Sequence, residues 1–479
     1  PSILLQHPAE CVRRRGVRWT AQPLAVTRAP VLAFQSHPFG CDNLAGRNQH
    51  SLGRSLGQSH LSVLLRAGSS GLRGSGRWLL DFGDQQFTAR SYAIDYELDL
   101  FSKFTYFLED PQNGDQFQQV DDRVVYGGYL RWRRSAGTEA AHEIGFVARY
   151  DDIDNVGLYT SAQRERTGTV REDSVGQLSA GIYYDYERVW NSKWRSILGV
   201  RADYFSFDVQ RSNLSENEGS ADDWMVSPKL NVIRTLTENA EAYFSAGTGF
   251  HSNDARGTVI TTDPVSGDPA QRVDPLVRSK GAEIGVRYFS ENTLNASAAL
   301  WVLELDSELL FVGDAGNTEP TGASIRYGIE IPVYYRLNET WLFDVELALT
   351  ESKFKDPVDG GDEVPGSVDR VLAAGTVAEF GNGVYGTLRV RYFGDRPLVE
   401  DGSVRSESST VWNLGFGYRG SRLDFRIDVL NLFDSGDDDI TYFYESRLPG
   451  EPAAGIGDLH FHPLEPRTIR AYLTWYSER

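Results

Sequence analysis

The sequence predicts an all-β protein, an antiparallel transmembrane β-barrel. Three observations predict it: an aromatic-rich composition, apolar residues that alternate with polar ones, and connections that alternate in length. The 479 residues include 24 Phe, 23 Tyr and 47 Gly but a single Met, a composition typical of barrels with aromatic girdles. No run of about 18 apolar residues occurs, which excludes a transmembrane helix but not membrane-crossing strands.

Strands are indicated from residue 85 onwards by a period of two in the sequence. Between 194 and 204, for example, Trp194, Leu198 and Val200 share one face of the expected strand. Charged residues occupy the opposite face of this strand and of several others. Those that we expect to face the barrel lumen are Arg195, Arg201, Asp203, Asp344, Glu346, Arg389 and Arg391.

Short connections alternate with long ones along the chain. Short turns are predicted near 134–141, 190–193, 235–239, 290–293, 336–340, 381–383 and 419–421. Long loops are predicted near 101–121, 151–172, 209–223, 251–276, 312–324, 353–366, 394–409 and 434–465. This gives about sixteen strands of roughly 9 to 15 residues, with short periplasmic turns and long extracellular loops, as in outer-membrane barrels. A soluble β-sandwich has no reason to sort its loops in this way.

The direction of the final strand sets the orientation. Residues 466–476 leave a long loop and end on the short-turn side, so we expect the C-terminus in the periplasm. Aromatic residues lie near the short turns, at Trp190, Trp194, Tyr288, Tyr335, Trp341, Tyr418 and Trp475. Amphipathic rings suit the lipid headgroup level, so these residues predict a periplasmic girdle. Because hydrocarbon cannot satisfy an open sheet edge, we expect the strands to close into a barrel.

Residues 1–84 differ in texture from the rest of the chain. They hold both Cys and four of the eight His, and the first Tyr of the chain is Tyr92. The segment is rich in Arg, Gly and Ser without a sustained period, which is typical of disorder. Translation in a wrong reading frame would also produce it. We expect residues 1–84 to be disordered or mistranslated, and residues 85–479 to form the barrel.

Charge bears on the partners of the protein. The formal net charge is −19, and the excess of acidic residues lies behind the Arg-rich front segment. This argues against nucleic acid as a partner, because phosphate binding needs a surplus of Lys and Arg. Carboxylates are dense at 151–154, 216–223 and 434–439. They either bind divalent cations that bridge to lipopolysaccharide or form solvated loop faces.

Three stretches of the barrel region carry a recognisable pattern. Residues 227–232 read Ser-Pro-Lys-Leu-Asn-Val, and the hairpin that follows reaches Gly-Thr-Gly-Phe at 247–250 before a loop. Residues 425–434 end in Asn-Leu-Phe-Asp, and 465–475 begin Glu-Pro-Arg-Thr-Ile. In this order the three resemble the mid-barrel hairpin, penultimate strand and last strand of TonB-dependent outer-membrane receptors. The likeness covers residues 85–479.

The resemblance implies a function. Receptors of this family have a barrel of about 22 strands behind a plug domain. They import a scarce nutrient with energy relayed by the TonB complex. We therefore expect a monomeric receptor in the outer-membrane lipid, with a ferric siderophore or a similar small-molecule chelate as its ligand. Neither a plug nor a TonB box is found in the sequence, so we expect a truncated receptor. The alternative is a passive porin-like channel of sixteen strands, which needs no plug.

Candidate ligand-binding residues lie where a strand runs into the second-longest loop. They are His251, Asn253, Asp254 and Arg256. Their donors and acceptors suit an anionic or hydroxyl-rich metal chelate. The same side chains could instead hold the strand exit together by hydrogen bonds.

Motifs for catalysis are not recognised. The sequence has no Cys-x-x-Cys and no phosphate-loop signature, so we expect neither an enzyme nor a cofactor. His460, His462 and Glu465 have spacing that could serve a metal, but a fourth ligand is missing. We therefore expect no metal site.

Overall fold

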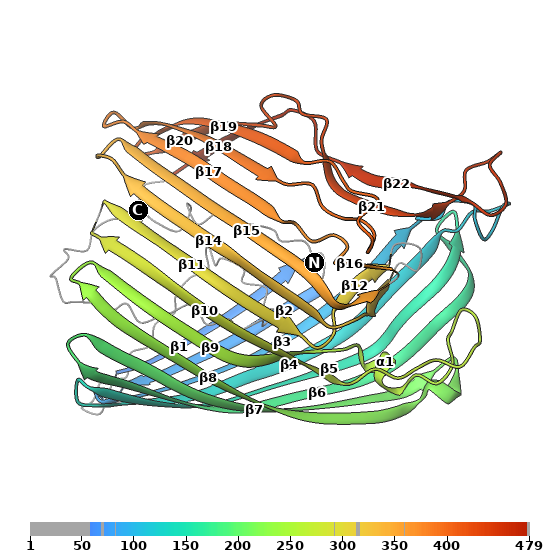
Figure 1. Cartoon of the computed structure of the whole chain (residues 1–479), viewed down its shortest axis with the longest axis horizontal. Coiled ribbons are helices and arrows are strands. Elements are labelled where there is room, and N and C mark those ends of the chain that lie inside the picture. The colour runs from blue at the N-terminus through green and yellow to red at the C-terminus, as the bar shows by residue number, and fades with distance from the viewer. Residues whose placement is uncertain are drawn as a thin grey trace. The chain divides into compact units, whose positions relative to one another are not determined.

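The computed structural model describes residues 58–68, 71–81, 83–291, 293–312, 317–358 and 360–476. All of these belong to one compact unit, Leu32–Arg479. Most of them form strands of a single antiparallel sheet (Figure 1). Of the helices described, none is both long and apolar enough to cross a membrane.

The main sheet follows the chain from strand to strand. Its strands are β1 (Gln58–Gly68), β2 (Gly71–Asp81), β3 (Gln85–Ser102), β4 (Phe117–Ala136), β5 (Ala140–Ala162), β6 (Glu165–Asn191), β7 (Trp194–Ser212), β8 (Gly219–Thr237), β9 (Ala240–Ser252), β10 (Leu276–Ser290), β11 (Leu294–Leu305), β14 (Ser324–Arg336), β15 (Trp341–Val358), β16 (Gly361–Glu363), β17 (Arg370–Glu379), β18 (Val384–Phe393), β19 (Ser409–Arg419), β20 (Leu423–Leu430) and β23 (Thr468–Trp475). The short β16 pairs only with β15.

Two small hairpins lie outside the series. They are β12 (Leu309–Val312) with β13 (Asn317–Pro320), and β21 (Asp438–Ser446) with β22 (Ile456–Pro463). The predicted fold class is therefore confirmed, since the described chain is an antiparallel all-β sheet. The sixteen strands expected after residue 85 are present, and β1 and β2 raise the number of long strands in the series to eighteen.

Strands β1 and β2 lie inside the segment 1–84, for which composition indicated disorder or mistranslation. They pair with each other, and β2 pairs with β3, so the sheet begins before residue 85. Composition averaged over the whole segment conceals two short apolar stretches, at 61–65 and 78–80. Residues 1–57 lie outside the described residues.

The seven predicted short turns each connect two neighbouring strands and are confirmed. The loop predicted at 151–172 is wrong. There β5 and β6 continue as a long hairpin, and the chain reverses at Gln163 and Arg164, whose φ angles are 53° and 67°. Positive φ at both residues is the geometry of a tight type I′ hairpin turn. Most residues of this hairpin are polar on both faces of its strands, so the alternation of apolar and polar residues that indicates a strand is not visible in the sequence.

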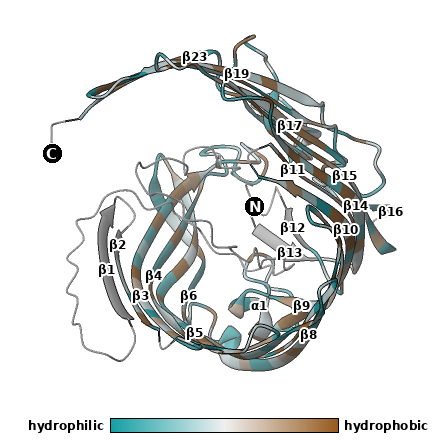
Figure 2. Ribbon diagram, turned by 90° about the vertical axis from the view of Figure 1, so that its left-hand side faces the viewer, coloured by the Kyte–Doolittle hydropathy of each residue, from teal (hydrophilic) through white to brown (hydrophobic). Residues whose placement is uncertain are grey.

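The pairings run in one series from β1 to β23. Between the described residues of these two outer strands no pairing occurs, so the expected closure is not part of this sheet. The sheet is curved, and α1 (Ala255–Val259) lies on its concave side (Figure 2). The other face carries exposed apolar side chains, as in the rung formed by Phe244, Ile284 and Leu300 across β9, β10 and β11.

Candidate ligand-binding site

The connection between β9 and β10, residues 253–275, folds back onto the concave face of the sheet (Figure 2). We call it the inward loop. Its helix α1 buries Ala255 and Val259 against Val175, Phe207 and Val209 of β6 and β7. Complete burial of a valine side chain contributes about 1.5–3 kcal/mol. This apolar contact therefore holds the start of the loop against the wall.

Asn217 fixes the next part of the inward loop. This buried residue lies between β7 and β8, and its Nδ2 donates to the carbonyl oxygen of Thr262 at 2.9 Å. Its Oδ1 accepts from the backbone N–H groups of Thr261 and Thr262, at 2.9 and 3.0 Å. One amide thus satisfies three backbone groups, and the loop is tied to its neighbour.

Asn253 closes the base of the inward loop. Its Nδ2 donates to the carbonyl oxygen of Asp274 at 2.7 Å, and its backbone N–H donates to that of Pro275 at 3.1 Å. The side chain is 6% exposed, and its Oδ1 has no hydrogen-bond partner among the described residues. Asn253 therefore acts first as a structural tie, with one acceptor to spare.

Asp254 and Arg256 form an ion pair at the start of α1. Asp254 caps the helix by accepting from the backbone N–H of Arg256 at 2.8 Å. Arg256 Nη2 also donates to Asp254 Oδ2 at 2.8 Å. Desolvation raises the pKa of the Asp254 carboxyl, but the charge and hydrogen bonds of Arg256 outweigh it and the net pKa lies below the ordinary value. Asp254 is therefore a carboxylate at neutral pH.

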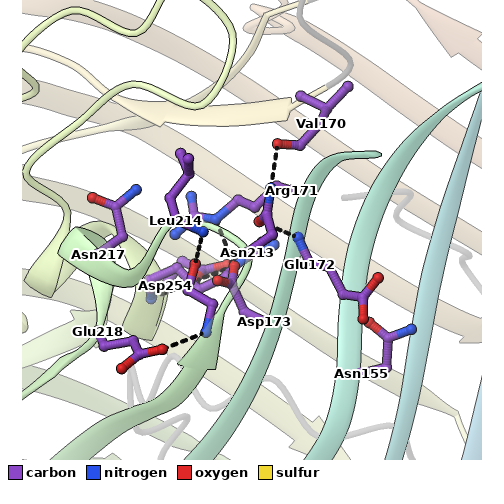
Figure 3. A network of polar contacts seen from close by, with 12 residues as sticks. Asn155, Val170, Arg171, Glu172, Asp173, Asn213, Leu214, Asn217, Glu218 and Asp254 are labelled. Carbon is purple, nitrogen blue, oxygen red and sulfur yellow. Dashed lines mark hydrogen bonds and ion pairs between the residues drawn. The ribbon is translucent and has the colours of Figure 1, made fainter. Parts of the chain in front are cut away.

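A second ion pair lies beside the first one. In β6, Arg171 Nε donates to Asp173 Oδ2 at 2.6 Å, and Figure 3 shows Arg171, Asp173 and Asp254 gathered at one place. Arg171 lowers the pKa of Asp254 through its charge. Asp173 is 1% exposed, yet its Oδ1 has no partner among the described residues, and neither has Arg171 Nη2. Buried polar atoms left unpaired in this way are uncommon and indicate a place for water or a ligand.

The four predicted site residues therefore separate into different roles. Asp254 and Arg256 come together, and Asn253 adjoins them in the loop base. His251 ends up half-buried in β9 with no partner for Nε2 among the described residues, and no contact of those described joins it to the ion pair. Arg171 and Asp173 are not among the predicted site residues: Arg171 lies within residues 151–172, for which a loop was expected, and Asp173 follows that range directly. Their period-two spacing was the available signal.

The seven charged residues expected to face the lumen are all engaged in the structure. Arg195 contacts Glu241, Arg201 contacts Asp203, Asp344 contacts Arg389, Glu346 accepts from Tyr334, and Arg391 lies 3.8 Å from Asp439. These contacts pair six of the seven charges with an opposite charge and give Glu346 a hydrogen-bond donor, which lowers the cost of holding them in a membrane protein. That the seven face a water-filled lumen stays a prediction.

Neither the carboxylate-rich stretches 151–154, 216–223 and 434–439 nor the group of His460, His462 and Glu465 forms a metal site among the described residues. His460 stacks on Tyr444 with 3.8 Å between the ring centroids, a packing contact within the β21–β22 hairpin.

Comparison with known proteins agrees with this geometry. A curved antiparallel sheet with an apolar outer face, paired charges on the other face and long loops at one end defines an outer-membrane β-barrel protein. Residues 33–432 match the family model described as "TonB dependent receptor-like, beta-barrel". The chain therefore belongs to the TonB-dependent receptor-like β-barrel family, which resides in the outer membrane and is not a family of enzymes. A comparison with curated protein sequences gave no match.

Solved structures show the same fold. The ferric yersiniabactin uptake receptor FyuA from Yersinia pestis matches with a TM-score of 0.66 and 14% identity over 85% of this chain and 61% of its own. The copper transporter OprC matches at 0.65 and 15%, over 88% and 70%. The ferric citrate transporter FecA matches at 0.62 and 16%, over 84% and 61%. The chain thus spans about three fifths of the length of FyuA and of FecA. The match to the family model favours a receptor over the porin-like channel that was the alternative.

Proposed function

We propose that this chain is the barrel of a TonB-dependent receptor that takes up a metal chelate, with a ferric siderophore or similar chelate as the first candidate. Membership of the receptor family supports the transport class. Two of the similar structures are named for ferric chelates and one for copper. Energy for import would come from the TonB complex of the inner membrane, and the receptor would act as a monomer in lipid and lipopolysaccharide.

The observation that carries the ligand proposal is the pair of adjacent ion pairs under the inward loop. Arg171 Nη2 offers a donor and Asp173 Oδ1 an acceptor that protein groups do not use among the described residues. Hydrogen bonds to charged groups are about twice as strong as neutral ones. Carboxylate, hydroxamate or catecholate oxygens of a chelate would suit the arginines, and its hydroxyl groups would suit the aspartate.

The test replaces Asp254 with Asn and Arg256 with Gln together, in the intact chromosomal gene of the source bacterium. Uptake of iron-labelled chelates and of a copper chelate is measured in iron-starved cells. We expect iron uptake to fall at least tenfold, because the pair that positions Arg171 and Asp173 is lost. Asp268→Asn with Arg272→Gln, two exposed residues of the same loop, is the matched control and should leave uptake unchanged.

Three outcomes are distinguishable when receptor amounts at the cell surface are equal. A loss of iron uptake in the first variant alone supports the proposal. A loss of copper uptake alone would change the substrate class and keep the site. Unchanged uptake of both metals would leave Asp254 and Arg256 with only the structural role of capping α1.

A further inference from the structure

A groove crosses the outer face of the sheet beside the short turn between β6 and β7. Its volume is about 420 Å³, within the range of about 300–1,000 Å³ that is common for ligand pockets. The residues that line it are Trp190, Asn191, Trp194, Arg195, Ser196, Leu198, Leu230 and Val232. Apolar side chains dominate this lining, and the groove lies outside the ion-pair site.

The groove exists because a small residue stands among large ones. Ser196 pairs with Val232 of β8 and shares its face of β7 with Trp194 and Leu198. Trp190 Nε1 donates to Ser196 Oγ at 2.9 Å. This hydrogen bond fixes the indole ring at the edge of the groove and satisfies its only polar atom. The groove therefore has a fixed shape, with Trp190 and Trp194 as its two walls.

Positive charge borders the groove at its turn end. Arg234 pairs in register with Trp194, and its guanidinium carbon lies 5.3 Å from the centre of that ring. Lys193 is exposed in the turn itself. Within the described chain, neither Arg234 nor Lys193 has a carboxylate at ion-pair distance, whereas the nearby Arg188 contacts Glu139 at 3.4 Å. Two cations at this edge are thus available to an anion.

Charge and apolarity together select one kind of occupant. The short-turn end faces the periplasm, and the leaflet on that side of the outer membrane consists of phospholipids. We propose that the groove is a binding site for an anionic phospholipid, with an acyl chain between Trp190 and Trp194 and the phosphate against Lys193 and Arg234. An apolar peptide would leave both cations unpaired, and a free phosphate would leave the apolar walls exposed.

The experiment measures lipid retention by native mass spectrometry on the receptor purified from outer membranes in detergent. Phosphatidylglycerol is titrated, and zwitterionic phosphatidylcholine serves as the comparison lipid. The receptor should retain the anionic lipid at least fivefold better. Ser196→Leu fills the groove and should abolish this preference. Lys193→Gln with Arg234→Gln should reduce phosphatidylglycerol retention to the level of phosphatidylcholine.

Matched controls come from two other short turns on the same side. Ala296 is the third residue of β11, as Ser196 is of β7, and Arg336 ends β14. Ala296→Leu and Arg336→Gln should retain phosphatidylglycerol as the unaltered receptor does. Heat-modifiable gel mobility checks that each variant is folded. Equal retention in all folded variants, or equal loss in test and control variants, would show ordinary boundary lipid only and would overturn the proposal.

Discussion

At the scale of single residues, several ion pairs reach across a glycine on the strand between them. Asp344 of β15 and Arg389 of β18 are both in register with Gly375 of β17, and Arg389 Nη2 donates to Asp344 Oδ2 at 2.6 Å. A Cβ atom at Gly375 would lie 2.7 Å from Arg389 Nη1. Asp185 and Lys229 meet in the same way over Gly199, with 2.9 Å between Oδ2 and Nζ. Glycine is needed there for close approach.

Gly375→Ala should therefore destabilise the sheet by about 1–3 kcal/mol, because overpacking displaces a paired charge. The measurement is urea unfolding of the refolded protein in detergent micelles. Gly386→Ala in neighbouring β18 is the control, since its Cβ would meet nothing closer than 3.7 Å. Equal effects of the two substitutions would contradict the steric argument.

The Asp254–Arg256 pair gives a prediction about pH. Because the pKa of Asp254 is depressed by folding, the pair is present above the ordinary carboxyl value of about 3.9 and is lost only as the pH falls through the lower folded value. Chelate binding that depends on this pair should stay constant from about pH 8 to pH 5. A step between about pH 8 and pH 5 that disappears in His251→Gln would instead bring His251 into the site.

At the scale of elements, the inward loop is held by contacts that come from outside its own hairpin. Its helix is only five residues long, too short to be stable by itself. Packing on β6 and β7 and the Asn217 hydrogen bonds give it a defined place. Asp254 and Arg256 reach the β6 ion pair for that reason.

Replacing Asn217 with Ala should release the inward loop, because two backbone N–H groups and one carbonyl lose their buried partner. Each such loss costs about 1–3 kcal/mol. Hydrogen–deuterium exchange of residues 255–262 should become faster. Asn213→Ala is the control, since Asn213 contacts Val170 and Glu172 of β6 instead. Unchanged exchange in Asn217→Ala would mean that the apolar contact alone holds the loop.

At the scale of the whole molecule, the two faces of the sheet have opposite chemistry. Apolar side chains on the outer face are exposed, with Ile284 at 58%, whereas Asp203, Asp344 and Asp428 are buried on the other face beside their arginines. A soluble protein would expose the opposite set. Mean hydropathy is −0.39 because the two sets average out.

Ile284→Arg should cost about 2–4 kcal/mol of folding free energy in lipid, because a charge would enter the middle of the hydrocarbon. The measurement is urea unfolding in lipid vesicles, followed by heat-modifiable gel mobility. Val265→Arg is the control: this residue of the inward loop is 79% exposed and should change stability by less than about 0.5 kcal/mol. A large effect of Val265→Arg would contradict the assignment of the outer face of the sheet to lipid and of the inward loop to water.

The sequence by itself determined the strands after residue 85, the seven short turns and the apolar outer face. Each of these depends on local alternation and turn residues, which are written along one stretch of chain. It also contained the pattern of the receptor family. It did not determine that 151–172 is a hairpin, since polar strand residues beyond the membrane resemble a loop.

Only the tertiary structure brought Arg171 and Asp173 beside Asp254 and Arg256. These residues are joined by the path of the inward loop and by strand register, and neither is encoded by neighbours in sequence. The same holds for the groove at Ser196, whose shape depends on β6 and β8. The face of the sheet on which a side chain lies is set locally, because side chains alternate along a strand. A binding site instead requires residues of strands far apart in sequence to lie at the same height along the barrel.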